Sequence, residues 1–298
     1  LKLLYNLVFY SPDKTQNIDT HLADTPQMNE QKSRILAMVE EVSRIPYEEV
    51  FIRSFDGLKL RGRYFHNRDS APVLICFHGY RGTPLRDFSG GTRAYLDLGY
   101  NLLMAEQRAH CGSEGHTITF GVNERRDAHA WVRYAQDRFG ADRPLALCGI
   151  SMGAATVLLA SGLGLPNAVR GIIADCPYTS ASAIIKKVCR GAHLPARLLY
   201  PLIARSARVY GNFDVEEADV LAAAARCPVP VLLVHGEADH FVPCQMSREL
   251  AAANPSKITL MTFPGAGHGL SFLVDRPRYV AAVTDFLSSI FRNSPGSV

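Results

Sequence analysis

The chain has 298 residues, of which 47% are hydrophobic and 20% are charged, and its formal net charge at pH 7 is +4. These values are ordinary for a globular protein, and the length is sufficient to bury a full core. The charge is only mildly basic and no run of lysine and arginine reaches five residues, so we expect no nucleic-acid partner.

Seven cysteines occur in apolar or loop-like contexts, and none of them forms a Cys-x-x-Cys pair. We interpret them as buried free thiols of a protein in a reducing compartment. Spacings that hold metal ions, such as His-Glu-x-x-His, do not occur either. We therefore expect no catalytic metal.

The first ten residues are apolar except for one lysine and one asparagine. They are too few to span a bilayer, so they are either the end of a hydrophobic anchor or an amphipathic helix packed on the domain. The polar stretch Ser11–Met28 predicts an exposed connector, and apolar residues at helical spacing predict a helix over Asn29–Ser43. We assign residues 1–45 to an N-terminal helical segment and residues 46–298 to the main domain.

From Val50 the apolar residues recur at every second position, which predicts an antiparallel hairpin that turns at Asp56-Gly57. Strand and helix patterns then alternate to the end of the chain. This alternation predicts an α/β fold with a mostly parallel, eight-stranded sheet and helices on both faces. The strands predicted after the hairpin are Val73–Phe77, Asn101–Ala105, Leu145–Cys148, Val169–Ala174, Val231–Val234 and Ile258–Phe263; the helices are Pro84–Leu98, Glu124–Phe139, one from Met152, Gln245–Ala253 and Tyr279–Phe291.

Residues 178–219 do not fit the simple alternation. Apolar residues at helical spacing fill this interval, which lies between two predicted strands. We predict a small helical cap, inserted over the ends of the strands. The alternative is one crossover helix with a long loop, and loops of that length seldom lack structure of their own.

An apolar run from Leu145 leads into residues 149–153, which form a Gly-x-Ser-x-Gly motif followed by small residues. This pattern predicts a strand, a sharp turn and a helix, with the Ser151 hydroxyl exposed at the sheet edge where a base can reach it. Glycine is needed at Gly149 and Gly153 because a Cβ atom there would crowd the neighbouring strand and helix. We interpret this turn as a nucleophile elbow.

A catalytic serine on such a turn needs an acid and then a histidine, in that order along the chain. Asp239 lies in the turn after the predicted strand Val231–Val234, where a carboxylate can orient a histidine and stabilise its protonated form. Glu237 and Asp175 are the competing carboxylates; we favour Asp239 because the Phe-Val-Pro close behind it resembles the usual sequence after such an acid. His268 follows the last predicted strand, bracketed by glycines, and is the predicted general base.

Residues 78–82 follow the predicted strand Val73–Phe77 and form a His-Gly-x-x-Gly loop, a type that binds an oxyanion. We predict that the backbone N–H groups of Tyr80 and Met152 form the oxyanion hole, with the positive end of the helix from Met152 behind them. His78 is expected to hold the loop by hydrogen bonding and not to act as a second base.

These four stretches together resemble the α/β-hydrolase superfamily, from about Val50 to the end of the last predicted helix. Residues 106–115 are similar to a structural loop of that family, although Glu106 stands where aspartate is usual and the glycine comes one place late. Ser-Met-Gly-Ala at 151–154 and Ala-Asp-Cys-Pro at 174–177 are similar to a group of bacterial serine hydrolases often described as uncharacterised, Bem46-like esterases. Members of that group commonly carry an N-terminal hydrophobic anchor, which would suit the apolar start of this chain.

The resemblance implies a cofactor-free serine hydrolase that cleaves carboxylic esters of small molecules with a triad of Ser151, His268 and Asp239. A prolyl-oligopeptidase-like peptidase, a thioesterase or an acyltransferase stays open, because several bond classes share this machinery. A binding module that keeps the fold without activity also stays open. We expect the protein in the bacterial cytoplasm or at the cytoplasmic membrane; its oligomeric state and acyl-chain preference are left open.

Overall fold

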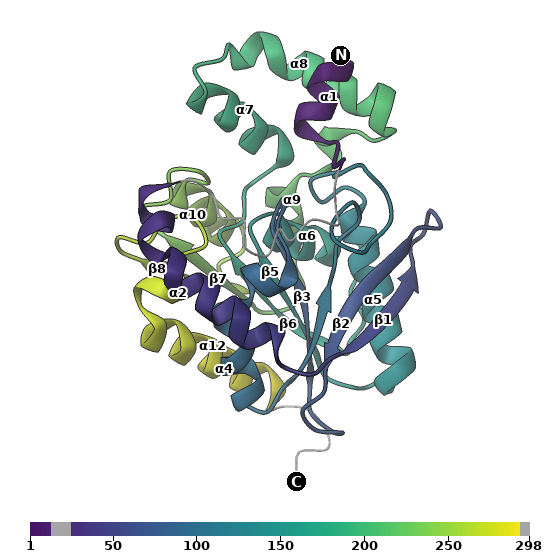
Figure 1. Ribbon diagram of the computed structural model, residues 1–298, viewed down its shortest axis with the longest axis vertical. Helices are drawn as coiled ribbons and strands as arrows, with labels where there is room; N and C mark the ends of the chain where they lie inside the picture. Colours follow the sequence, from purple (N-terminus) through teal and green to yellow (C-terminus); the bar gives the residue numbers. More distant parts are fainter. Residues whose placement is uncertain (13–24, 293–298) are drawn as a thin grey trace.

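The computed structural model describes residues 1–12 and 25–292 and has one eight-stranded sheet between two layers of helices (Figure 1). The strand order is β1-β2-β4-β3-β5-β6-β7-β8. β2 pairs antiparallel with β1 and β4, and all other pairs are parallel, so the predicted mostly parallel sheet is confirmed. The strands are β1 (Glu48–Arg53), β2 (Lys59–Phe65), β3 (Val73–Phe77), β4 (Asn101–Ala105), β5 (Leu145–Ile150), β6 (Val169–Asp175), β7 (Val231–Gly236) and β8 (Ile258–Phe263).

The central strands are continuous apolar runs because both of their faces are covered by helices. In β3, the side chains of Val73, Ile75 and Phe77 join one hydrophobic cluster, and those of Leu74 and Cys76 join the other. The first cluster includes α5 (Glu124–Phe139), α6 (Met152–Ser161), α9 (Val220–Ala225) and α10 (Cys244–Ala253); the second includes α2 (Pro26–Ser43), α4 (Ser89–Asp97), α11 (Ser271–Val274) and α12 (Arg276–Phe291).

Several predicted bounds differ from the structure, and two of the differences have a clear physical reason. The helix predicted over Pro84–Leu98 is two helices, α3 (Pro84–Asp87) and α4, because Phe88 leaves the helical conformation and two glycines of low helix propensity follow soon after it. The connector predicted over Ser11–Met28 ends earlier, since α2 begins at Pro26, and the Thr25 hydroxyl caps it by accepting the Met28 N–H at 3.2 Å. Residues 13–24 of the predicted connector lie outside the described residues.

The interval between β6 and β7 is helical, as predicted. It contains α7 (Ala181–Gly191), α8 (Ala196–Ser206), the π-helical turn η2 (Ala207–Gly211), the 3₁₀ turn η3 (Val215–Glu217) and α9. Figure 1 shows α7 and α8 above the sheet, and the Lys187 ammonium of α7 donates to the His240 carbonyl oxygen at 3.0 Å. Because His240 lies just after β7, these helices stand at the carboxyl ends of the strands, where ligands bind in such sheets.

The apolar start of the chain forms α1 (Lys2–Val8), which contacts α8 and η2. This matches the packed amphipathic helix, one of the two alternatives for this stretch. Phe9 is fully buried between the rings of Phe120 and Phe213, whose centroids lie 5.8 Å and 5.3 Å away. Among the described helices, none combines the length and the apolar character needed to cross a membrane.

Phe9→Ala should lower the free energy of unfolding by about 3–5 kcal/mol, because it empties a fully buried aromatic site. Leu3→Ala, at a side chain that is 70% exposed in α1, which Phe9 follows directly, is the control and should change stability little. Denaturant unfolding of both variants measures the difference. Equal effects of the two substitutions would show that α1 does not dock as described.

Candidate active site

Ser151 occupies the sharp turn between β5 and α6, as the motif predicts. Its backbone has φ 55° and ψ −114°, a conformation that residues other than glycine seldom adopt. Its N–H donates to the Asp175 carbonyl oxygen at 2.8 Å, which ties the turn to the end of β6. A strained residue that is held by its neighbours in this way is typical of functional sites.

The two glycines of the motif are required by close packing, as predicted. A Cβ atom at Gly149 would lie 2.3 Å from the Gly153 carbonyl oxygen in α6. A Cβ atom at Gly153 would lie 1.9 Å from the Phe77 carbonyl oxygen at the end of β3. The first turn of α6 therefore touches β3 directly, and the turn at Ser151 is held next to the loop that follows β3.

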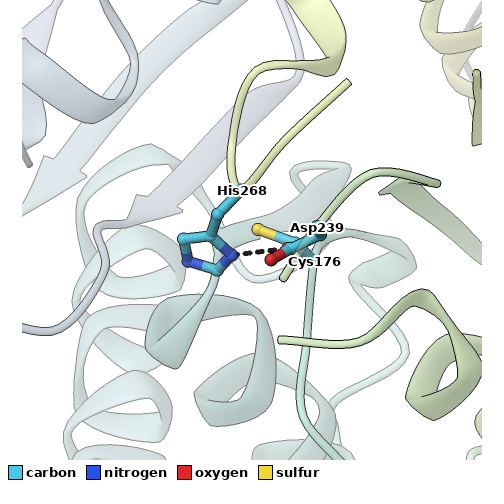
Figure 2. Close-up of side chains that lie close together, drawn as sticks. All are labelled: Cys176, Asp239 and His268. Carbon is cyan, nitrogen blue, oxygen red and sulfur yellow. Dashed lines mark hydrogen bonds and ion pairs between the residues drawn. The ribbon is translucent and has the colours of Figure 1, made fainter. Parts of the chain in front are cut away.

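The structure brings Ser151, His268 and Asp239 together from three different loops. His268 Nδ1 lies 2.7 Å from Asp239 Oδ2, and His268 Nε2 lies 2.9 Å from Ser151 Oγ. Because a carboxylate only accepts hydrogen bonds, Nδ1 carries the hydrogen, and Nε2 is left to accept one from the serine hydroxyl. Figure 2 shows the Asp239 carboxylate facing the His268 ring. This is the geometry in which a histidine can take the proton of a serine.

Asp239 is buried and is held by several donors. The backbone N–H groups of Phe241 and Val242 donate to its Oδ1 at 2.9 Å and 2.8 Å. Burial alone would raise the pKa of Asp239, but the hydrogen bonds of His235 and His268 outweigh it and keep that pKa well below its ordinary value. The carboxylate is therefore charged and ready to stabilise a protonated His268.

His235 is a second histidine beside this carboxylate, and the sequence analysis missed it. It lies in β7, is fully buried, and its Nε2 is 2.8 Å from the Val242 carbonyl oxygen and 3.3 Å from Asp239 Oδ2. The carbonyl can only accept, so Nε2 carries the hydrogen and Nδ1 accepts from the Ser247 hydroxyl at 2.7 Å. The sequence signal that could have found His235 is its position four residues before Asp239 and directly before Gly236.

The two competing carboxylates lie elsewhere. Glu237 is exposed and accepts from the Thr262 hydroxyl at 2.6 Å. The Asp175 side chain is buried behind the turn, where the Tyr279 hydroxyl donates to its Oδ2 at 3.2 Å and its Oδ1 has no partner among the described residues. Of the three candidates, only Asp239 hydrogen-bonds to His268.

The loop at residues 78–82 lies against the turn at Ser151. A Cβ atom at Gly79 would be 3.4 Å from Ser151 Cβ. Three backbone N–H groups of the loop have acceptors. The Gly79 N–H donates to the Asp87 carboxylate, and the Arg81 N–H donates to His110 Nε2. The Gly82 N–H donates to the Gly79 carbonyl oxygen. Within the part of the chain that the structure describes, the N–H groups of Tyr80 and Met152 have no acceptor. Both therefore keep a hydrogen that another acceptor could take.

Two neutral histidines support this loop. His78 accepts the Gln107 N–H at Nε2, 3.1 Å away, and His110 accepts the Arg81 N–H at Nε2, 3.0 Å away. Burial lowers the pKa of His78 to about 4 and that of His110 to about 3, so both rings are uncharged near neutral pH. His78 thus holds the loop by hydrogen bonding, as expected, and Gln107 and His110 come from the loop whose family resemblance was noted above.

The unusual Glu106 in that loop has its own partners. It is fully buried and accepts from the guanidinium groups of Arg61 at 2.6 Å and Arg63 at 3.1 Å, both in β2. The Gly112 N–H donates to it at 2.8 Å. The longer side chain is therefore accommodated by arginines of the neighbouring strand.

A further contact that the sequence analysis missed comes from α2. The Gln27 side-chain amide donates to the Gly265 carbonyl oxygen and accepts the Gly267 N–H, both at 2.7 Å. Gln27 thus bridges the two residues on either side of Ala266, in the loop that carries His268. It belongs to the stretch that the sequence pattern assigned to an exposed connector, where polarity alone gave no sign of this role.

Cys176, Asp239 and His268 place their ligand atoms within 4.8 Å of one another (Figure 2). Side chains of these types can hold a divalent metal ion if the thiol and the imidazole both lose a hydrogen. Burial raises the pKa of the Cys176 thiol well above its ordinary value, and His268 Nδ1 donates to Asp239. Both features favour the protonated, hydrogen-bonded arrangement over a metal site. All seven cysteines are free thiols, as predicted, but only six of them are buried, because Cys111 is partly exposed.

Comparison with known proteins decides the family. A model described as the alpha/beta hydrolase family matches residues 73–283. The chain belongs to the alpha/beta hydrolase family. The predicted resemblance and fold class are thereby confirmed. The chain's bacterial relatives include the uncharacterized protein YqkD of Bacillus subtilis, which is 26% identical over 80% of this chain and 78% of that protein. Another is the uncharacterized protein YfhR of Salmonella typhi, which is 32% identical over 69% of this chain and 68% of that protein.

Solved structures agree with this assignment. The esterase Pf2001 of Pyrococcus furiosus superposes with a TM-score of 0.69 and 25% identity, over 84% of this chain and 93% of that one. Est1E of Butyrivibrio proteoclasticus shares the fold, with a TM-score of 0.62 and 20% identity over 82% of this chain and all of that one. Family membership and the esterase among the similar structures support a hydrolase.

Asp175→Asn should stabilise the protein at high pH. Burial raises the pKa of Asp175 from 3.8 to about 6, so the unfolded chain releases this proton more readily than the folded chain. Ionisation therefore costs stability progressively as the pH rises from about 4 to about 6, and the full cost persists above that. We expect the variant to gain up to about 3 kcal/mol in free energy of unfolding near pH 8 and nothing near pH 4.

Denaturant unfolding at both pH values measures this difference. The matched control is Asp285→Asn, which removes an exposed carboxylate from α12. A gain that is the same at both pH values, or a loss near pH 8, would contradict the assignment of Asp175 as a buried carboxyl that resists ionisation.

Proposed function

We propose that this chain is a serine hydrolase that cleaves carboxylic esters of small molecules without a cofactor. The observation that carries the proposal is the continuous hydrogen-bonded arrangement from Ser151 Oγ to His268 Nε2 and from His268 Nδ1 to Asp239 Oδ2. A serine hydroxyl is a weak nucleophile until a base takes its proton, and this arrangement supplies the base and the group that orients it.

In the first half of the reaction, Ser151 Oγ attacks the acyl carbon and its proton passes to His268 Nε2. Asp239 stabilises the imidazolium that forms, and the negative charge moves to the former carbonyl oxygen. The N–H groups of Tyr80 and Met152 donate to that oxygen, and one such donor is typically worth about 3–4 kcal/mol of barrier. His268 then gives its proton to the departing alcohol, which leaves an acyl group on Ser151.

In the second half, a water molecule attacks the acyl carbon while His268 Nε2 takes one of its protons. The bond to Ser151 Oγ breaks, Oγ regains a proton from His268, and the carboxylic acid departs. The Asp239 carboxylate keeps its charge throughout, which its low pKa favours. The cycle consumes one water and restores the starting protonation states.

The likeness to the esterase Pf2001 supports an ester substrate. Thioesters are the second candidate, because the thiohydrolase aneE of Aspergillus aculeatus is 27% identical over 148 residues, 49% of this chain. An acyltransferase or a prolyl-oligopeptidase-like peptidase would use the same groups. A binding module without catalytic activity would not need Ser151 Oγ within 2.9 Å of His268 Nε2, with the His268 ring oriented by a carboxylate.

The test is hydrolysis of p-nitrophenyl acetate, butyrate and octanoate by the wild type and by Ser151→Ala, with circular dichroism to verify folding. We expect wild-type turnover and a loss of at least about 10³-fold in the variant, because the nucleophile is gone. The control Ser161→Ala removes a buried serine hydroxyl at the far end of α6, which donates to the Leu158 carbonyl oxygen, and should keep wild-type turnover.

Turnover by Ser151→Ala at the wild-type rate would contradict the proposal. If neither protein hydrolyses the esters, a thioester and an aminoacyl amide series with the same variants separates the remaining bond classes. Hydrolysis confined to the amides would replace the ester proposal with the peptidase.

A further inference from the structure

The surface formed by α1, α8 and η2 exposes many large apolar side chains. Among the described residues, nine of the sixteen large hydrophobic side chains that are exposed lie in residues 1–8 and 188–210. Leu198 is 72% exposed and Leu3 is 70% exposed, so they project into solvent instead of packing on the core. The nine are Leu1, Leu3, Leu7, Val188, Leu194, Leu198, Leu202, Val209 and Tyr210.

Helical spacing explains why these side chains point outward together. In α8, Leu198 and Leu202 are four residues apart and share one face, while Tyr200 and Ile203 are buried on the other. In α1, Leu3 and Leu7 repeat this spacing. Because α8 contacts α7, α1 and η2, the exposed residues belong to one lobe, residues 1–8 and 181–211, which forms the top of the molecule in Figure 1.

The same lobe is strongly basic. Residues 181–211 contain six lysines and arginines and no aspartate or glutamate. Arg190, Arg197 and Arg205 are exposed, and no carboxylate among the described residues pairs with them. Among the described residues, carboxylates contact these helices where residues 214–216 adjoin them: Asp214 pairs with Arg208 at 2.8 Å, and Glu216 accepts from the Tyr200 hydroxyl.

This lobe is also connected to the candidate active site. The Tyr80 hydroxyl donates to the Val8 carbonyl oxygen at 2.8 Å, and the Arg81 guanidinium donates to the Leu7 and Tyr10 carbonyl oxygens. On the other side, Lys187 of α7 reaches the loop that carries Asp239. A surface that bound this lobe would therefore lie close to the loops that carry Tyr80 and Asp239.

We propose that the outer face of α1, α8 and η2 binds the surface of an anionic lipid bilayer. Projecting leucines insert among acyl chains, while arginines bind the phosphate groups and are attracted by the negative surface potential. A second copy of the chain fits this face less well, because it would bring two cationic surfaces together. The inference goes beyond ester hydrolysis and does not depend on it, since binding needs no turnover.

The test is flotation of the full chain with phosphatidylcholine vesicles that contain or lack phosphatidylglycerol. We expect binding only to the anionic vesicles, weakened by added salt. Arg197→Gln with Arg205→Gln should weaken it about 25-fold, since each cation near such a surface contributes a factor of about five. Leu198→Ser with Leu202→Ser should weaken it at least about tenfold, because the inserted apolar area is lost.

Matched double variants outside the lobe should bind like the wild type. They are Arg133→Gln with Arg226→Gln and Leu163→Ser with Leu221→Ser, all at exposed positions. No wild-type binding to anionic vesicles, equal binding to both vesicle types, or equal effects of lobe and control variants would overturn the proposal. A dimer in sedimentation that the Leu198→Ser, Leu202→Ser variant abolishes, without vesicle binding, would assign the face to a second copy instead. None of these outcomes alters the ester assay, so the two proposals fail separately.

Discussion

The close contact between the start of α6 and the end of β3 positions the rest of the candidate site. Gly153 lies so near the Phe77 carbonyl oxygen that a Cβ atom has no room there. This contact brings the turn at Ser151 against the loop that β3 leads into, so the serine hydroxyl and the Tyr80 and Met152 N–H groups lie in one region. The strained backbone of Ser151 persists because β6 and α6 hold it on both sides.

Each loop of the site is in turn held by side chains from another part of the fold. Neutral buried histidines secure the loop that carries Tyr80, His235 supports Asp239, and Gln27 bridges the loop that carries His268. Such supports restrict the motion of the loops that carry Ser151, Asp239 and His268, and so fix these side chains relative to one another. The helices α1 and α7 extend this network outward, so the basic, apolar lobe and the site share their supporting loops.

Most of the fold and the three central residues could be predicted from the sequence, because each has a local signal. Continuous apolar runs marked the strands, and Gly-x-Ser-x-Gly, an acid after a strand and a histidine between glycines marked Ser151, Asp239 and His268. Gln27 and His235 could not be predicted this way, since their partners are determined by tertiary contacts across the chain. The break at Phe88 was missed because apolar residues continue on both sides of it, while the backbone leaves the helical conformation at that residue.

The most direct measurement of the central claim is the rate at which a fluorophosphonate labels the protein, with the modified peptide identified by mass spectrometry. If His268 activates Ser151, the label is found on Ser151, and His268→Gln slows labelling at least about 10³-fold while the protein stays folded. Labelling of a different serine, or an unchanged rate in His268→Gln, would contradict the account.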